Sequence, residues 1–592
     1  MKQLSYPFDS DLILRTRKSI KSELLSVKEA RLRKKIAILG GSTTSEIKNI
    51  LELFLLHYGI EPVFYESDFA QYWQDAMFGD KLREFSPDIV FIHTTSRNII
   101  KWQNLRDNCE QVDALLEEQI LHYTSMWDII AQDLKCAIIQ NNFERPLFRL
   151  LGNKDVSDFR GRTNFISRLN QAFYTYAQEH EEFYINDIDY LSASFGLERW
   201  SDSATWHMYQ YALSINAIPE LAFSVANIIK SLCGKNKKAL VLDLDETLWG
   251  GVVGDDGMEG LVLGQETPNG RVYSEFQEYI KAHKDLGIPL NVCSKNDKAN
   301  ALAGLNHPDG VLVPEDFTII KANWESKDRN VIEIAQELNI GADSLVFVDD
   351  NPAERAIVSA QIPGIAVPEV DTAEEYIKRI DRSGFFEVTT ITSEDVARSE
   401  MYKENLKREK LKQQFECYSD YLKSLEMVAV IHDFEPICFA RISQLANRSN
   451  QFNLTTKRYT ESEIATVAED SNYIKLYGKL SDKFGDNGLV SVIIGKKDGS
   501  SLHLKLWIMS CRVLKRDMEW AMLGCLVEKA QSAGIKTLVG YYFPTAKNGL
   551  VTDFYGTMGF DKVDEDEHGN TVWSYSVCSH VDKNEAIVIN NE

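Results

Sequence analysis

The stretch LVLDLDETLWGG, residues 240–251, places two aspartates one residue apart at the end of an apolar run. The apolar residues before them are typical of a buried strand. Burying one carboxylate costs free energy, and a second one nearby makes it harder to ionise both. A chain keeps such a pair where a positive group lies between them. The stretch therefore predicts a strand end that holds a cation or a basic side chain.

Four polar features follow apolar runs in the block between residues 234 and 385. The runs ALVLDLDET, IPLNVCSKND, FTIIKANW and SLVFVDDNP alternate with helical spacing, which favours a parallel sheet covered by helices. The carboxyl ends of parallel strands meet at one edge of a sheet, so residues far apart in sequence converge there. The residues expected at this edge are Asp243, Asp245, Ser294, Asn296, Lys327, Asp349 and Asp350.

This combination of side chains indicates phosphoryl transfer. Carboxylate oxygens are the ligands that Mg²⁺ prefers, and Mg²⁺ also binds substrate phosphate. A lysine and a cation neutralise the phosphoryl oxygens while an in-line oxygen attacks phosphorus. Here the attacking oxygen is expected to be a carboxylate, which gives an aspartyl phosphate.

Two further blocks flank this one. Residues 34–233 alternate strands with helices, and residues 425–580 mix strands with the long helix MEWAMLGCLVEKAQSAG. A charged helix over roughly residues 396–415 is expected to connect the second and third blocks. The predicted fold is a three-domain α/β protein with boundaries at 1–233, 234–385 and 386–592.

Charge and cysteine usage restrict the partners. The chain has 88 acidic and 65 basic residues, a formal charge of −23 that repels phosphate backbones and anionic membranes. We therefore expect neither a nucleic-acid nor a membrane partner. The nine cysteines are dispersed, with no CxxC pair, which is typical of reduced thiols. No apolar run approaches the ~18 residues of a membrane span, and we expect a cytoplasmic protein.

The motifs DLDET, SKND, the lysine of NWESK and VFVDDNP resemble the four motifs of the haloacid dehalogenase (HAD) superfamily. The resemblance implies Asp243 as nucleophile and Asp245 as general acid and base, with Thr247 supporting the loop. It also implies Ser294 and Asn296 near the phosphoryl group and Lys327 stabilising its charge. Mg²⁺ is expected on Asp243, on the carbonyl of Asp245 and on the last acidic pair. Either Asp349 or Asp350 contacts it directly; Asp350 is favoured, with Asp349 reached through water.

The distance between the first two motifs leaves no room for a large cap domain. Between Asp245 and Ser294 the chain offers only a glycine-rich flap, GGVVGDDGMEGLVLG, and one helix. A cap normally excludes water from a small substrate. An uncapped site suits a macromolecular substrate, or one covered by a neighbouring domain.

Stretches in the third block extend the resemblance to nearly the whole chain. RISQLANRSNQFNLTTKRYT, FGDNGLVSVII, MSCRVLKRDMEWAML and FYGTMGF are similar to the FkbH-like family. Its members join an SGNH-hydrolase-like domain with a flavodoxin-like sheet, a HAD domain and a GNAT-like acyltransferase domain. The resemblance implies a glyceryl transferase that uses 1,3-bisphosphoglycerate, a phosphorylated acyl donor, and loads the glyceryl group onto an acyl carrier protein through a thioester.

Two cysteines are candidates for the acyl acceptor. Cys293 directly precedes Ser294, and Cys511 lies in MSCRV before the long helix. A thiolate can capture an activated acyl group as phosphate leaves. The alternative for each is a small buried hydrophobic side chain at the end of a strand.

Other polar residues of the flanking blocks have two interpretations each. Asn447, Arg448, Asn450 and Gln451 form either a substrate-binding loop or a turn with satisfied amides. The run VLKRDMEW has no glycine for a loop whose backbone amides bind a pyrophosphate. One interpretation is that the charges of Lys515 and Arg516 replace those amides. The others are that the third domain binds a phosphopantetheine arm, or that it only packs over the HAD site.

The first block has the elements of a hydrolase site only in part. Gly41 and Ser42 lie where these hydrolases have their nucleophile, and Asp202 and His207 lie where they have an acid–histidine pair. The spacing DSATWH and the stretch HTTSRN, however, depart from the usual pattern of these hydrolases. We expect Ser42 to cap a helix and the domain to serve in docking. The sequence thus predicts acyl transfer coupled to phosphate removal; the alternatives are a stand-alone phosphatase with inert flanking domains and a non-catalytic assembly factor.

Overall fold

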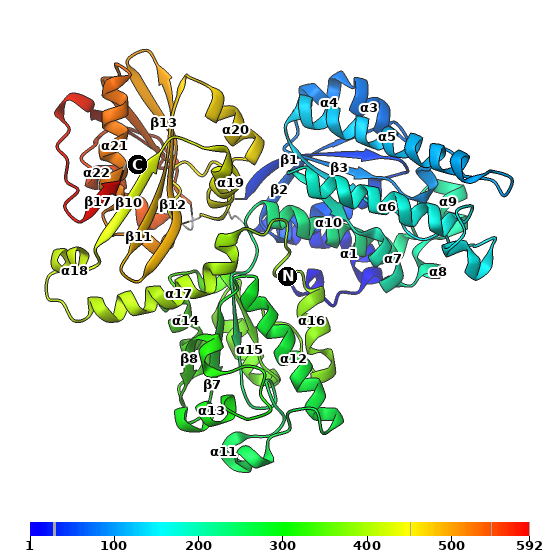
Figure 1. Ribbon diagram of the computed structural model, residues 1–592, viewed down its shortest axis with the longest axis horizontal. Helices are drawn as coiled ribbons and strands as arrows, with labels where there is room; N and C mark the ends of the chain where they lie inside the picture. The colour runs from blue at the N-terminus through cyan, green and yellow to red at the C-terminus, as the bar shows by residue number, and fades with distance from the viewer. Residues whose placement is uncertain (28–30, 450, 546–547, 591–592) are drawn as a thin grey trace. The chain divides into compact units, whose positions relative to one another are not determined.

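The computed structural model describes residues 1–27, 31–449, 451–545 and 548–590 (Figure 1). The chain separates into two compact units. The first comprises residues 1–233 with 460–463, and the second comprises residues 234–459 with 464–592. Three sheets are formed among the described residues, one in the first unit and two in the second. Within the same residues, no helix has both the length and the apolar character needed to cross a lipid bilayer.

A five-stranded parallel sheet in the order β2-β1-β3-β4-β5 forms the first unit. Its strands are β1 (Leu32–Gly40), β2 (Ile60–Glu66), β3 (Ile89–His93), β4 (Ala137–Asn141) and β5 (Phe183–Asn186). This strand order is that of flavodoxin-like folds. Because side chains alternate along β1, Ile36 and Ile38 join one apolar cluster while Ala37 and Leu39 join the other.

Helices cover both faces of this sheet. One cluster packs β1 against α1 (Ser10–Ser26), α2 (Ser45–His57) and α10 (Ile218–Leu232), and the other packs it against α3 (Tyr72–Phe78), α5 (Cys109–Leu134) and α6 (Arg162–Glu179). The shorter helices are α4 (Asp80–Phe85), α7 (Ile188–Phe195), α8 (Leu197–Trp200) and α9 (Ser203–Tyr209). Asn108 and Gln111 form a capping box that begins α5.

A four-stranded parallel sheet in the order β8-β7-β6-β9 carries the acidic motifs. Its strands are β6 (Ala239–Leu242), β7 (Leu290–Ser294), β8 (Phe317–Ala322) and β9 (Leu345–Val348). Between and after them lie α11 (Val253–Asp256), α12 (Pro268–Asp285), α13 (Lys298–Leu305), α14 (Lys327–Glu337), α15 (Pro352–Gln361) and α16 (Tyr376–Arg382). β6, β7 and β9 are short and fully buried, as expected where helices cover both faces, whereas only Phe317 and Ile319 are buried in the edge strand β8.

An eight-stranded mixed sheet in the order β15-β16-β14-β13-β12-β11-β10-β17 follows. Its strands are β10 (Met427–His432), β11 (Tyr473–Asp482), β12 (Gly485–Asp498), β13 (Ser501–Met509), β14 (Thr537–Tyr542), β15 (Asp561–Glu565), β16 (Thr571–Ser576) and β17 (Ile587–Asn590). Four further helices belong to this part, α18 (Tyr418–Ser424), α19 (Phe439–Arg448), α20 (Glu461–Glu469) and α22 (Phe554–Thr557). The strands β11, β12 and β13 are joined by hairpins, and α21 (Met518–Ser532) packs on the sheet through its apolar side.

The charged connector predicted over residues 396–415 is the helix α17 (Ser393–Lys412). It begins three residues earlier than the charge pattern indicates, because Thr392 and Asp395 form a capping box there. Near its other end, the guanidinium of Arg408 pairs with Asp482 of β11 at 2.8 Å, and both side chains are fully buried. This buried pair fixes α17 to the mixed sheet.

Candidate active site and metal centre

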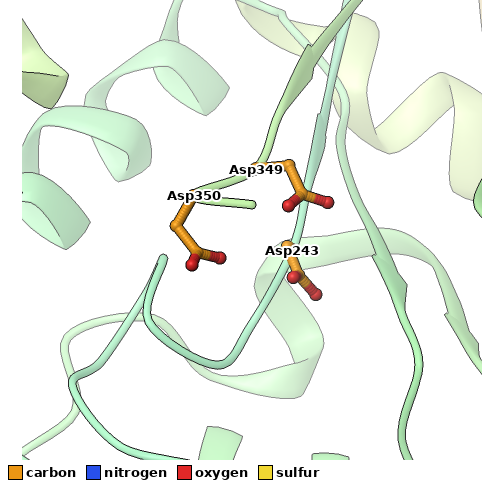
Figure 2. A group of neighbouring side chains, drawn as sticks. All are labelled: Asp243, Asp349 and Asp350. Carbon is orange, nitrogen blue, oxygen red and sulfur yellow. The ribbon is translucent and has the colours of Figure 1, made fainter. Parts of the chain in front are cut away.

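Three carboxylates meet at the carboxyl edge of the four-stranded sheet. Asp243 directly follows β6, and Asp349 and Asp350 follow β9, the strand that pairs with β6. One oxygen from each lies within 4.8 Å of the others. Figure 2 shows their carboxylates gathered at the ends of the two strands. Parallel pairing in register, Leu242 opposite Val348, is what brings these acids together.

Lys327 supplies the positive charge among the acids. It is the first residue of α14, and its Nζ donates to Asp243 Oδ2 at 2.6 Å and to Asp349 Oδ2 at 2.5 Å. Burial acts to lower the pKa of Lys327, but the attraction of the two carboxylates outweighs it and raises the pKa above the ordinary value. The lysine is therefore charged and links two strand ends.

One ammonium does not balance three carboxylates. Burial, with repulsion from Asp243, raises the pKa of Asp349 to about 6 and also raises the pKa of Asp350. The second oxygen of Asp243, Oδ1, is buried and has no hydrogen-bond partner in the described part of the chain. Excess negative charge, oxygen-only donors and a bare buried oxygen together fit a hard divalent cation such as Mg²⁺.

Asp245 lies two residues after Asp243, but its side chain makes a different set of contacts. Its Oδ1 accepts hydrogen bonds from Trp249 Nε1 at 2.9 Å and from the backbone N–H of Val253 at 3.0 Å. Its Oδ2 accepts from Asn296 Nδ2 at 2.8 Å. Burial raises the pKa of Asp245, which favours a carboxyl that holds a proton. Its side chain is not part of the three-acid cluster, so only the expected contact through its backbone carbonyl remains open to the metal.

The segment between Asp245 and β7 contains no cap domain among the described residues. It consists of a flap closed by the pairing of Gly250 with Val262, the short helix α11 and the helix α12. The flap begins at the two groups that hold Asp245, the Trp249 indole and the Val253 amide. The insertion between the first two motifs is therefore the flap and helix that the sequence predicts.

Thr247 supports the acidic loop, as the resemblance implies, whereas Asn296, which is expected near the phosphoryl group, positions Asp245. The hydroxyl of Thr247 is fully buried and accepts from the backbone N–H of Asp350 at 3.2 Å, which fixes the acidic loop. Asn296 donates to Asp245, as described above. Ser294 ends β7, on the other side of β6, with its backbone carbonyl accepting from Asn323 N at 3.2 Å.

Arg355 positions the acidic loop, a role that the sequence pattern did not predict. Its Nη1 donates to the carbonyls of Asp349 at 2.8 Å, Asp350 at 2.6 Å and Val370 at 2.7 Å. It lies in the first turns of α15, which Asn351 caps, so the arginine reaches back over the acidic loop. A basic residue within two helical turns after an acidic pair is the signal that identifies it.

Cys293 does not have the environment of an acyl acceptor. It is fully buried on β7 among Val241, Ile319 and Val331, and its thiol lies 3.7 Å from the carbonyl of Lys327. Burial raises the pKa of this thiol well above its usual range, so the reactive thiolate is disfavoured. This corrects the catalytic assignment in favour of a core side chain. The side chain of Cys511 lies outside the described residues.

The polar cluster after α19 is described only in part. Asn447 donates to the carbonyl of Tyr459 at 3.1 Å, as a satisfied turn amide does. Gln451 has a buried Oε1 without a partner among the described residues. Asn450 and the side chain of Arg448 lie outside what the structure describes. Arg516 is buried and bonded to Asn405 and Asp482, so it is not available to replace pyrophosphate-binding amides.

The hydrolase-like residues of the first unit do not form a triad. Asp202 caps α9 by accepting from the backbone N–H groups of Ala204 and Thr205, and the exposed His207 has no bond to it. Ser42 does not cap a helix, because α2 begins at Ser45 with Thr44 as its N-cap. The Ser42 hydroxyl is buried without a partner among the described residues.

Comparison with known proteins agrees with the central geometry. Residues 35–230 match the model of the FkbH N-terminal domain. A solved N-terminal part of the protein BF1531 from Bacteroides fragilis, described as containing a phosphatase domain complexed with Mg, is 29% identical; the match covers 63% of this chain and 98% of that one, with a TM-score of 0.58. These comparisons confirm the predicted resemblance to FkbH for residues 35–230 and the likeness to a structure that contains a phosphatase domain.

Several acetyltransferase structures also match parts of the chain. The ribosomal-protein-S18-alanine N-acetyltransferase of Escherichia coli is 14% identical and aligns over 27% of this chain and 99% of its own, with a TM-score of 0.21. A GNAT-family acetyltransferase of Streptococcus pneumoniae is 17% identical over 25% and 98%, also with a TM-score of 0.21. A search of curated protein sequences found no match.

Proposed function

We propose that this chain, FkbH-like through residues 35–230, is a Mg²⁺-dependent HAD-type phosphatase whose phosphate removal is coupled to acyl transfer onto a carrier protein. The observation that carries the phosphatase is the Lys327 bridge between Asp243 and Asp349 beside a bare Asp243 oxygen. The Mg complex of the BF1531 phosphatase part supports the metal. Bound by Asp243, Asp350 and the Asp245 carbonyl, Mg²⁺ would neutralise charge on the phosphoryl oxygens.

The residues divide the phosphatase reaction into two balanced steps. A carboxylate oxygen of Asp243 attacks phosphorus, the bond from phosphorus to the leaving oxygen breaks, and Asp245 gives its proton to that oxygen. Water then attacks the aspartyl phosphate, Asp245 takes a proton from the water, and the bond to Asp243 breaks with release of phosphate. Lys327 stabilises the charge on the phosphoryl group in both steps.

The proposed acyl donor is 1,3-bisphosphoglycerate, the donor implied by the family resemblance. A thiol attacks its acyl carbon, a sulfur–carbon bond forms, the bond from the acyl carbon to the phosphate oxygen breaks, and inorganic phosphate leaves while the thiol proton passes to solvent. The remaining phosphate ester is then a substrate for the Asp243 site. The burial of Cys293 leaves Cys511 or the carrier's own phosphopantetheine thiol as the attacking group. It also favours the second candidate function, a stand-alone phosphatase, because burial keeps Cys293, a residue beside this site, in its thiol form.

Intact-mass measurement of a carrier distinguishes the two functions. We expect purified protein, Mg²⁺, 1,3-bisphosphoglycerate and holo acyl carrier protein to yield a carrier heavier by one glyceryl group. Cys511→Ser is the informative variant, because it stops the mass gain only if this thiol relays the acyl group. Apo carrier, which has no arm thiol, is the matched control and must stay unchanged.

An unmodified carrier in every reaction, together with phosphate release from small phosphomonoesters, contradicts the acyl-transfer proposal and leaves the stand-alone phosphatase. Failure to release phosphate from any phosphomonoester or acyl phosphate contradicts the phosphatase itself and favours an assembly factor.

Metal binding is expected to stabilise the protein in a pH-dependent way. The pKa of Asp349 is about 6 against an ordinary value near 4, so the metal-free folded chain binds this proton more tightly than the unfolded chain does. That contribution to stability is complete below about pH 4 and is lost as the pH rises through about 6. Because Mg²⁺ removes the repulsion, its gain in Tm should be small at pH 5 and larger at pH 7.5.

The variant Asp350→Asn should lose most of the Mg²⁺-dependent gain while its metal-free Tm stays level or rises, since one repelling charge is removed. Asp285→Asn, at an exposed acid on α12, is the control and should respond to Mg²⁺ as the wild type does. An equal gain in Asp350→Asn and wild type at pH 7.5 contradicts the metal assignment.

A further inference from the structure

Three loops lie together at the carboxyl edge of the first unit's sheet. One follows β3 (residues 94–106), one follows β4 (residues 142–161), and the third contains α9. The third loop reaches the end of β1, because Thr43 donates from its backbone to the carbonyl of Gln210 at 3.0 Å and from its hydroxyl to that of Tyr209 at 2.7 Å. The three loops together are called the edge surface below.

Specific contacts join these loops into one surface. The buried amide of Gln103 donates to the carbonyl of Gly161 at 2.8 Å, and Ser96 donates from its hydroxyl to buried Glu144 at 2.6 Å. Two arginines stack on indoles across the loops, Arg162 over Trp102 at 4.7 Å and Arg97 over Trp206 at 4.2 Å. The surface is therefore preformed and not an assembly of independent loops.

The edge surface is basic although the chain is acidic. Residues 94–106 contain three basic residues and no acid, and residues 142–161 contain four basic residues, the buried Glu144 and two aspartates. Both aspartates are already engaged: Asp155 is buried and accepts from the backbone of Thr163, and Asp158 is paired with Arg160 at 2.9 Å. Among the residues that the structure describes, the exposed Lys101, Arg106 and Arg149 have no carboxylate partner. In a chain of net charge −23, this local excess of positive charge marks a surface that attracts anions.

Large apolar side chains lie exposed among these cations. Their exposed fractions are 80% for Phe148, 81% for Leu150, 56% for Ile100 and 63% for Met208, with Leu105 and Tyr209 also exposed. A surface of apolar anchors surrounded by unpaired cations matches the anatomy of a protein interface, in which apolar contacts give affinity and charges steer the approach.

We propose that the edge surface docks a small acidic protein which presents apolar side chains between carboxylates, and, resting on the proposed function, that this protein is the acyl carrier protein. A nucleic-acid backbone would bury little of the apolar surface of the exposed Phe148 and Leu150. An acidic helical protein, in contrast, can cover the apolar side chains and pair with the basic ones at the same time. The net charge of the chain also disfavours a polyanion more strongly than a small acidic protein.

The test measures binding of holo acyl carrier protein to the full chain by isothermal titration calorimetry at low and at physiological salt. We expect the double variant Lys101→Glu/Arg149→Glu to raise the Kd at least about tenfold above the wild-type value, with the largest effect at low salt. Phe148→Ser/Leu150→Ser should weaken the Kd by a similar factor at both salt concentrations, because it removes apolar contact only.

A matched charge reversal serves as control. Lys18→Glu/Lys81→Glu changes two exposed lysines of α1 and α4 by the same total charge and should leave the Kd within about twofold of wild type. All variants should keep the wild-type Tm and the wild-type rate of phosphate release from a small phosphomonoester, because none of these residues belongs to the Asp243 site.

Several results overturn the docking proposal. The first is that the wild type does not bind the carrier. The second is that the control variant Lys18→Glu/Lys81→Glu loses as much affinity as the edge variants, and the third is that both edge variants keep the wild-type Kd. The docking proposal is also overturned if the protein self-associates through this surface. It is overturned as well if single-stranded RNA or anionic vesicles bind more tightly than the carrier and the same edge variants abolish that binding, because the surface then belongs to another partner. Carrier that binds through this surface but never gains mass leaves the docking proposal intact and contradicts the proposed acyl transfer.

Discussion

Asp243→Asn is expected to lower phosphate release at least about 1,000-fold, or about 4 kcal/mol in activation free energy. The amide has nearly the shape of the carboxylate but is not a nucleophile, so no aspartyl phosphate forms. The metal-free protein should remain folded, because the change removes one of three neighbouring negative charges while Lys327 keeps Asp349. Steady-state release of phosphate from a small phosphomonoester measures the effect.

Asp285→Asn is again the control for this change, because Asp285 is an exposed acid on α12. It should retain wild-type turnover. Radiolabelled phosphate trapped on the wild type by acid quenching, and absent from Asp243→Asn, identifies the covalent step. Turnover within tenfold of wild type in Asp243→Asn contradicts the assignment of the nucleophile and with it the proposed phosphatase mechanism.

Lys327→Met is expected to affect stability and activity together. The lysine is 3% exposed and bridges two buried carboxylates, so its removal leaves both without compensation. Breaking such a buried pair costs about 3 kcal/mol or more, and losing a charge that stabilises the transition state costs about 100- to 1,000-fold in turnover. Urea denaturation with and without Mg²⁺ measures the first effect, and Mg²⁺ should restore part of the lost stability.

The chain offers a closely matched control in Lys321. Its Nζ also bridges two carboxylates, Glu333 at 2.9 Å and Glu337 at 2.6 Å, but these lie at the surface. Lys321→Met should therefore cost less than about 1 kcal/mol and leave turnover unchanged. If both lysine variants lose the same stability, or if Lys327→Met keeps wild-type turnover, the charge of Lys327 is not what holds this site together.

The sequence predicted the placement of the acidic motifs because a simple rule governs them. Short apolar runs spaced by helices form parallel strands, and residues directly after such strands meet at one edge. Asp243, Asp349 and Asp350 follow β6 and β9 immediately, so their positions needed no information about side-chain packing. The same reasoning anticipated the small flap between Asp245 and β7.

Side-chain contacts across the fold were not predictable in this way. Arg355 reaches the acidic loop only because α15 begins at Pro352 and turns the arginine back, which strand spacing does not reveal. Ser42 was predicted to cap a helix, but α2 begins three residues later. For Cys293, its position beside Ser294 suggested reactivity, whereas the alternation of side chains along β7 places its thiol in the core.

The contacts of Asp245 link its protonation to the start of the flap. Both of its oxygens already accept hydrogen bonds, Oδ1 from Trp249 and Val253 and Oδ2 from Asn296. A carboxyl that takes up a proton weakens at least one of these bonds, because the protonated oxygen becomes a donor facing another donor. Each proton that Asp245 takes up or gives away during turnover therefore acts on the start of the flap, through Trp249 and Val253, or on Asn296.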